Sequence, residues 1–127
     1  MAFKVVIGRT REERLRYKKK GLIKIAKQYV QMGQISSLTN NVYLDIATTH
    51  VILITGKRGS GKSTSLSVMA EEISRLDEEI KQRLAVVMFD TLGVFWTMKY
   101  PNYRQQALLD KWKLTPEATK VDIFVPY

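Results

Sequence analysis

Eight consecutive residues, from position 56 to position 63, have the types and spacing needed to hold a phosphate group. Gly56-Lys57-Arg58-Gly59-Ser60-Gly61-Lys62-Ser63 fits G-x-x-x-x-G-K-[ST], the Walker A pattern of a phosphate-binding loop. Glycines let the backbone approach an anion closely, so that its N–H groups can surround a phosphate. Lys62 would bring a positive charge to the phosphates, and the Ser63 hydroxyl would bind Mg²⁺. We therefore predict a nucleotide site with Lys62 as its catalytic group, formed by Gly56, Lys57, Arg58, Gly59, Ser60, Gly61, Lys62, Ser63 and Thr64.

A loop of this kind needs a strand before it and a helix after it. The apolar, β-branched run Val51–Ile54 predicts a buried strand of a parallel sheet. After the loop, apolar residues recur at steps of three and four, which predicts an amphipathic helix. These residues are Leu66, Met69, Ala70, Ile73, Leu76 and Ile80. The helix would direct the positive end of its dipole toward the phosphates.

Further strands and helices are predicted on both sides of this unit. Apolar runs predict strands at Phe3–Ile7, Val42–Ile46, Ala85–Asp90 and Val121–Val125, and residues 102–112 predict a helix. Alternating strands and helices predict an α/β fold of the P-loop NTPase type, with a mostly parallel sheet flanked by helices.

The segment before residue 42 is harder to interpret. Thr10 and Glu13 fit a capping box that opens a basic helix reaching Lys20, with Gly21 ending it. The apolar residues within 22–30 fit either one face of a helix or a strand. Residues 33–41 are polar and rich in turn formers, so we expect a loop there.

Composition excludes several kinds of chemistry. The 127 residues suffice for one domain and contain no cysteine, which excludes disulfides and thiolate catalysis. His50 is the only histidine; at the entrance to a predicted strand it is more often a structural residue than a catalyst. No run approaches the roughly 18 apolar residues of a membrane span, and Met1-Ala2-Phe3-Lys4 lacks the apolar core of a signal peptide, so nothing suggests export. We expect a cytoplasmic protein without a membrane partner.

Positive charge is concentrated near the N-terminus. Residues 1–30 carry a net charge of +8, against +1 for all the others. This asymmetry predicts a basic segment, residues 1–40, that contacts DNA or RNA, with Tyr17 and Tyr29 near enough to stack on bases. A solvated, charge-rich helix explains the same charge equally well. Residues 41–127 would form the nucleotide-binding core.

Asp90 is a second candidate for metal binding. It ends an apolar run as a Walker B aspartate does, and Asp90-Thr91-Leu92-Gly93 also fits the D-x-x-G pattern of GTPases. Asp90 lies only 28 residues after Lys62, on what looks like the next strand, which argues against a GTPase. The alternatives are that Asp90 caps a turn or lies in a subunit interface.

Three stretches together resemble the HerA/FtsK superfamily, and most closely the HerA-like ATPases of archaeal type. They are Leu44-Asp45-Ile46, the run from His50 to Ser63, and Phe89-Asp90-Thr91-Leu92-Gly93-Val94-Phe95-Trp96. The resemblance covers about residues 40–125. It implies a homo-oligomeric, typically hexameric, ATPase that uses ATP and Mg²⁺ and moves along or pumps DNA, often beside a nuclease.

The chain departs from that family after Asp90. The resemblance leads us to expect a later strand that carries a catalytic glutamate, and an arginine finger, but neither is found in the sequence. We therefore expect the N-terminal part of such an ATPase, for which phosphate binding is predicted and hydrolysis is left open. The alternatives are a non-hydrolysing nucleotide- or nucleic-acid-binding module, a small GTPase and a nucleotide kinase.

Overall fold

The computed structural model describes residues 4–126. These residues fall into two compact units, the first ending at Ala85 and the second beginning at Val86. The phosphate-binding loop belongs to the first unit and Asp90 to the second. The predicted domain boundary after residue 40 remains a prediction.

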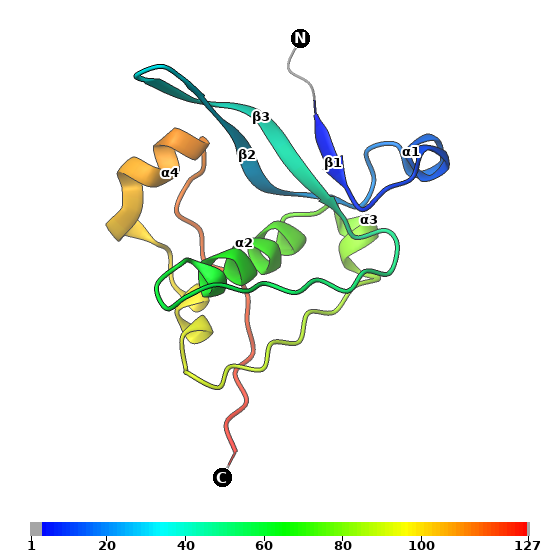
Figure 1. Ribbon diagram of the computed structural model, residues 1–127. Coiled ribbons are helices and arrows are strands. Elements are labelled where there is room, and N and C mark those ends of the chain that lie inside the picture. Colours follow the sequence, from blue (N-terminus) through cyan, green and yellow to red (C-terminus); the bar gives the residue numbers. More distant parts are fainter. Residues whose placement is uncertain (1–3, 127) are drawn as a thin grey trace. The chain divides into compact units, whose positions relative to one another are not determined.

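The first unit is built on a three-stranded sheet in the order β1-β3-β2 (Figure 1). Its strands are β1 (Val5–Ile7), β2 (Leu22–Met32) and β3 (Ile35–Asp45). β1 lies parallel to β3, with Val5 opposite Val42, whereas β2 is antiparallel to β3. The sheet is therefore mixed, and the prediction of a mostly parallel sheet is not confirmed.

β2 and β3 form a long hairpin where a loop was predicted for residues 33–41. Met32 pairs with Ile35 across a two-residue turn, and Gly33 adopts a φ of 61° at the first turn position. Glycine is favoured there in the turn type that matches the twist of a hairpin. The polar composition of residues 36–41 misled the prediction, because pairing with β2 along the strand outweighs local propensity.

Three helices accompany the sheet. α1 (Arg11–Tyr17) begins with the predicted capping box: Glu13 N donates to Thr10 Oγ1, and Thr10 N donates to Glu13 Oε2. α1 ends three residues before Lys20, and Lys18 follows it with a φ of 50°. The short α3 (Glu78–Lys81) contains Ile80, which had been assigned to the helix after the loop.

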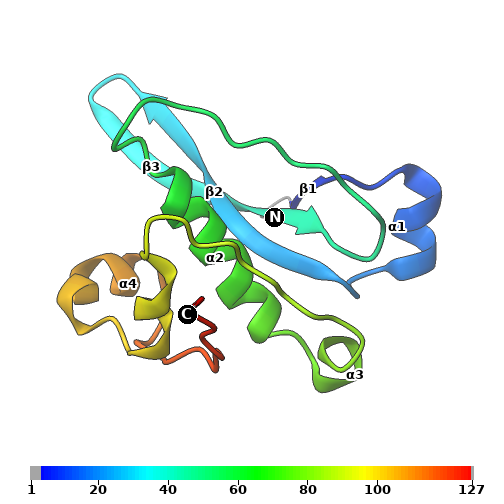
Figure 2. The same ribbon diagram turned by 90° about the horizontal axis from the view of Figure 1, so that it is seen from below.

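The longest helix, α2 (Lys62–Ser74), confirms the helix predicted after the loop. It lies alongside β2 (Figure 2), and Glu72 Oε2 accepts a hydrogen bond from Lys24 N of that strand at 3.3 Å. The buried apolar side chains among the described residues of this unit, Ile23 and Leu44, belong to the sheet.

The second unit is organised around short helical turns. It contains η1 (Phe95–Lys99), η2 (Tyr103–Gln105) and α4 (Gln106–Trp112), so the helix predicted from residue 102 forms only in part. Met98 of η1 is buried, and its carbonyl accepts a hydrogen bond from Thr119 N at 2.8 Å.

Three predicted strands are wrong. Residues 51–54, 85–90 and 121–125 form no strand in the structure. A strand buried on both faces needs a hydrogen-bonded neighbour and cover above and below it. These segments have no strand partner among the described residues, and Val51, Phe89 and Phe124 are each at least 90% exposed.

Two smaller points complete the comparison. The first strand is confirmed from Val5 onward, whereas Phe3 lies outside the described residues. No helix in residues 4–126 is long and apolar enough to cross a membrane.

Candidate nucleotide-binding site

The predicted phosphate-binding loop forms a compact turn that runs directly into α2. Ser60 N donates to Lys57 O at 3.2 Å, which closes the turn in the middle of the loop. Gly59 and Gly61 have φ angles of 77° and 89°. A side chain at either position would be strained in this left-handed conformation. The spacing of the glycines thus matches the places where the backbone needs them.

Gly56 lies close to the Ser60 side chain. A Cβ atom on Gly56 would lie 2.4 Å from Ser60 Oγ, so the Ser60 hydroxyl would have to turn away. The residue before the turn and the residue that closes it are therefore close together in space.

The start of α2 leaves a cluster of N–H donors without a side-chain acceptor. Gly61 is the N-cap residue and provides no capping side chain, and the first turn of the helix contains no acidic residue. The first N–H groups of a helix have no partner within the helix, and they lie at the positive end of its dipole. This end of α2 is therefore suited to a negatively charged ligand.

Lys62 already points across the loop. Its Nζ donates a hydrogen bond to Lys57 O at 2.8 Å, so the ammonium group lies against the backbone that precedes the turn. The side chain is half-exposed, so the ammonium group is accessible from solvent. The structure thus brings the predicted cation and the predicted N–H donors together.

The other predicted residues of the loop are exposed. Lys57, Arg58, Ser63 and Thr64 all face solvent. In residues 4–126 no group of three or more His, Cys, Asp or Glu side chains could hold a metal ion. Mg²⁺ would then be bound together with the phosphates, with the Ser63 hydroxyl as the ligand from this loop.

Asp90, the other metal candidate, folds back on the segment that follows it. Phe95 N donates to Asp90 Oδ2 at 2.8 Å, which agrees with the alternative that Asp90 caps a turn. Burial alone would raise the pKa of this carboxyl, but the N–H groups of residues 92–95 outweigh burial and hold the pKa below its usual range. Oδ1 is buried without a hydrogen-bond partner among the described residues. A buried carboxylate oxygen without a partner is uncommon in proteins.

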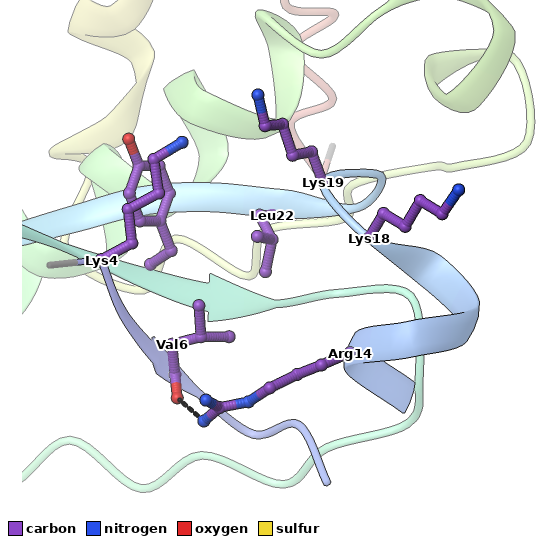
Figure 3. A pocket seen from close by; sticks show the side chains of 7 residues that line it. Lys4, Val6, Arg14, Lys18, Lys19 and Leu22 are labelled. Carbon is purple, nitrogen blue, oxygen red and sulfur yellow. Dashed lines mark hydrogen bonds between the residues drawn. The ribbon is translucent and has the colours of Figure 1, made fainter. Parts of the chain in front are cut away.

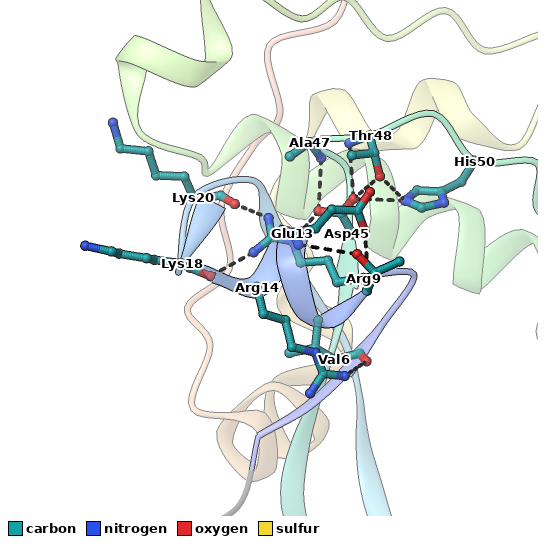
Figure 4. Close-up of polar contacts among 11 residues, drawn as sticks. Val6, Arg9, Glu13, Arg14, Lys18, Lys20, Asp45, Ala47, Thr48 and His50 are labelled. Carbon is teal, nitrogen blue, oxygen red and sulfur yellow. Dashed lines mark hydrogen bonds and ion pairs between the residues drawn. The ribbon is translucent and has the colours of Figure 1, made fainter. Parts of the chain in front are cut away.

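A second polar cluster was not predicted from the sequence (Figure 4). Arg9 and Asp45 form an ion pair with 2.6 Å between Nε and Oδ1, and both side chains are completely buried. The rest of the Arg9 guanidinium donates to the carbonyls of Lys18, at 2.7 Å, and Lys20. Arg9 thus holds the turn after α1 against the end of β3.

The other side of Asp45 is bound to the segment that leads toward the loop. Thr48 Oγ1 donates to Asp45 Oδ2 at 2.5 Å, and His50 Nε2 lies 2.9 Å from the same oxygen. An ionised carboxylate can only accept, so Nε2 of His50 carries the proton. His50 is therefore a structural residue, as expected.

The hydrogen bonds around Asp45 control its ionisation. Burial raises the pKa of the carboxyl, but the side chains of Thr48, His50 and Arg9 together with Ala47 N lower it by more. The net effect holds the pKa of Asp45 well below its usual range. Asp45 thus stays charged and connects three segments: Arg9, the turn at residues 18–20, and residues 47–50.

The loop at residues 56–63 ends at the start of α2, but residues 51–54 do not form the strand that precedes a phosphate-binding loop. The family described as "Helicase HerA, central domain" matches residues 30–123, about three quarters of the sequence. The chain belongs to this family, as the resemblance indicated. No curated protein and no solved structure matches the chain.

Proposed function

We propose that this chain is the ATP-binding part of a HerA-like ATPase that moves along DNA. The observation that carries the proposal is the loop at residues 56–64, where Lys62 Nζ lies across a glycine turn at the uncapped start of α2. The family match supports a module of the ATPase type.

Each part of the loop has a role in this proposal. The N–H groups of the glycine turn and the first turn of α2 hold the phosphates, and Lys62 neutralises their charge. Ser63 provides a hydroxyl for Mg²⁺, which spreads the negative charge of the phosphates when bound. The assignment of Asp90 to the metal remains a prediction from the sequence.

The resemblance also suggests partners for the ATPase. We infer a homo-oligomer, a hexamer by that resemblance, that acts on DNA and works beside a nuclease. The +8 charge of residues 1–30 supports a polyanionic partner.

Replacing Lys62 tests the proposed ATP site. Lys62→Ala should weaken binding of a fluorescent ATP analogue with Mg²⁺ by roughly tenfold or more, since a charge-assisted contact is worth about 1.5–3 kcal/mol. Lys99→Ala, which removes an exposed lysine of the second unit, is the matched control and should leave affinity unchanged. Equal affinity of the wild type and a folded Lys62→Ala variant would refute the assignment.

A small GTPase is the second candidate, and one sequence observation favours it. Besides D-x-x-G at Asp90, the residues Thr119-Lys120-Val121-Asp122 fit the guanine-reading pattern [NT]-K-x-D. Competition between unlabelled ATP and GTP for the labelled analogue separates the candidates. Preference for GTP, lost in Asp122→Ala, would support the GTPase and contradict the ATPase.

A further inference from the structure

The first unit contains a hollow of about 300 Å³ that is distinct from the phosphate-binding loop. It is lined by Lys4, Val6, Arg14, Lys18, Lys19, Leu22 and Tyr43, which we call the basic pocket (Figure 3). The lining comes from β1 and the residue before it, α1, the turn after α1, and the two strands β2 and β3. This volume is at the lower end of the range typical of small-ligand sites.

The positive charge of the basic pocket is not neutralised by any of the residues that line it. Four of its seven lining residues are lysine or arginine, and none is acidic. All four are exposed. Holding four like charges around one hollow is unfavourable, and an anion placed among them relieves the repulsion. The basic pocket is therefore suited to an anionic ligand.

Two basic residues near the basic pocket have acidic partners, one buried and one exposed. Arg9 is buried against Asp45, and Lys20 lies 3.4 Å from Glu79. The guanidinium groups of Arg9 and Arg16 lie over the ring of Tyr17, so this ring already contacts two cations. The four cations of the basic pocket are exposed and line one hollow, so they can approach the same anion together.

The floor of the basic pocket is apolar, and this limits what the anion can be. Val6 and Leu22 face each other between the cations in Figure 3, and both are half-buried. Tyr43 adds a half-buried aromatic ring, with Lys4 Nζ 5.5 Å from its centroid. Inorganic phosphate would leave this apolar surface exposed to water, whereas a phosphate attached to a flat or apolar group would cover the surface.

We propose that the basic pocket binds one nucleotide of a single-stranded nucleic acid. The backbone phosphates would contact Lys18, Lys19 and Arg14, and the base would lie on the floor near Tyr43. In a duplex the bases are stacked and paired, so only phosphates reach the pocket. In a single strand a base can turn outward onto an aromatic surface. This inference rests on the nucleic-acid partner proposed above and specifies its form and its contacts.

The test compares a short fluorescein-labelled oligothymidylate with a hairpin duplex of matched length, by anisotropy at several salt concentrations. Lys18→Gln/Lys19→Gln should weaken binding of the oligothymidylate and flatten its log–log salt dependence by about 1.4, since each phosphate contact contributes about 0.7 on a single strand. Lys99→Gln/Lys120→Gln makes the same change in charge at exposed positions of the second unit and should have little effect.

Tyr43 tests the base contact separately from charge. Tyr43→Leu should weaken oligothymidylate binding at least about fivefold and leave duplex binding unchanged, because stacking on an aromatic ring is worth about 1–3 kcal/mol per base. Tyr43→Phe keeps the ring and should bind as the wild type does. If a thermal melt shows that Tyr43→Leu does not fold, Tyr43→Val, which suits a strand and also lacks the ring, tests the same contact with the same expected loss on the single strand.

Two outcomes would overturn the proposal. If Lys18→Gln/Lys19→Gln and Lys99→Gln/Lys120→Gln weaken binding equally, binding is spread over the surface and does not depend on the basic pocket. If Tyr43→Leu weakens binding of the duplex as much as binding of the single strand, no base contacts Tyr43. ATP binding, measured on the same variants, separates this inference from the proposed ATPase. The Lys18/Lys19 variant should bind ATP normally, and Lys62→Ala should bind the oligothymidylate normally.

Discussion

Arg9 is one of ten basic residues among the first thirty, yet its charge is not available to a partner, because Asp45 neutralises it in the interior. A buried ion pair of this kind often adds little net stability, because taking two charges out of water costs about as much free energy as their attraction returns. Removing one member, however, leaves an uncompensated charge in the interior. The pair therefore matters most for keeping the segments around it in one arrangement.

Asp45→Asn should lower the free energy of unfolding by about 3–5 kcal/mol, since the Arg9 guanidinium would remain buried without a counter-charge. Urea unfolding of the two proteins measures the difference. Glu79→Gln is the matched control. It removes a carboxylate whose pair with Lys20 is two-thirds exposed on both sides, and such pairs contribute less than about 1 kcal/mol. Similar effects of the two substitutions would show that the buried pair is not special.

The same residue predicts a dependence on pH. Since folding lowers the pKa of Asp45, its contribution to stability is complete above the ordinary aspartate pKa of about 3.9 and is lost as the pH falls below it. Thermal melts from neutral pH to acid should show the wild type losing its advantage over Asp45→Asn in that range. A constant difference at every pH would contradict this account.

Local patterns could predict some site residues and not others. The residues of the predicted phosphate-binding loop follow one another in the chain, so their spacing alone was enough to propose them. Arg9 and Asp45 lie 36 positions apart, and nothing in the sequence near either one indicates the other. The one available signal was an aspartate at the end of an apolar strand, which suggests a partner without naming it.

At the scale of elements, the sequence predicted best where local signals act alone. The capping box at Thr10 and the periodicity after Lys62 each specify a helix through neighbouring residues, and both helices form. The hairpin and the buried strands depend on distant partners. Residues 35–41 form a strand because β2 pairs with them, and residues 51–54 do not, because no strand pairs with them among the described residues.

The capping box offers a test at this scale. Thr10→Ala removes the acceptor of Glu13 N and should cost about 1 kcal/mol of stability, within the range of roughly 0.5–2 kcal/mol for such caps. Thr10→Ser keeps a hydroxyl at the same place and should retain most of that stability. Urea unfolding of the three proteins gives the comparison. A loss in Thr10→Ser equal to that in Thr10→Ala would mean that the methyl group, not the cap, is responsible.

For the whole molecule, membership of the HerA family and the loop geometry together support ATP binding more strongly than ATP hydrolysis. No apolar run ending in Asp-Glu follows Asp90 in the sequence, and no residue is identified as an arginine finger. An arginine finger alone can contribute about 10³–10⁵-fold to the rate.

The chain by itself should therefore hydrolyse ATP slowly or not at all. Phosphate release under steady-state conditions measures this, with Lys62→Ala as the background. Repeated turnover at about one per second, within the ordinary range for phosphoryl-transfer enzymes and abolished by Lys62→Ala, would show that a catalytic residue is present in this chain.

The most direct test of the central claim is to record backbone amide signals by NMR while ATP and Mg²⁺ are added. The account predicts that the shifted amides are those of residues 56–64 and the first turn of α2, and that Lys62→Ala abolishes these shifts. Shifts concentrated instead at Lys4, Arg14, Lys18 and Lys19, with residues 56–64 unmoved, would show that ATP binds as a simple anion in the basic pocket, and would contradict the assignment of the loop.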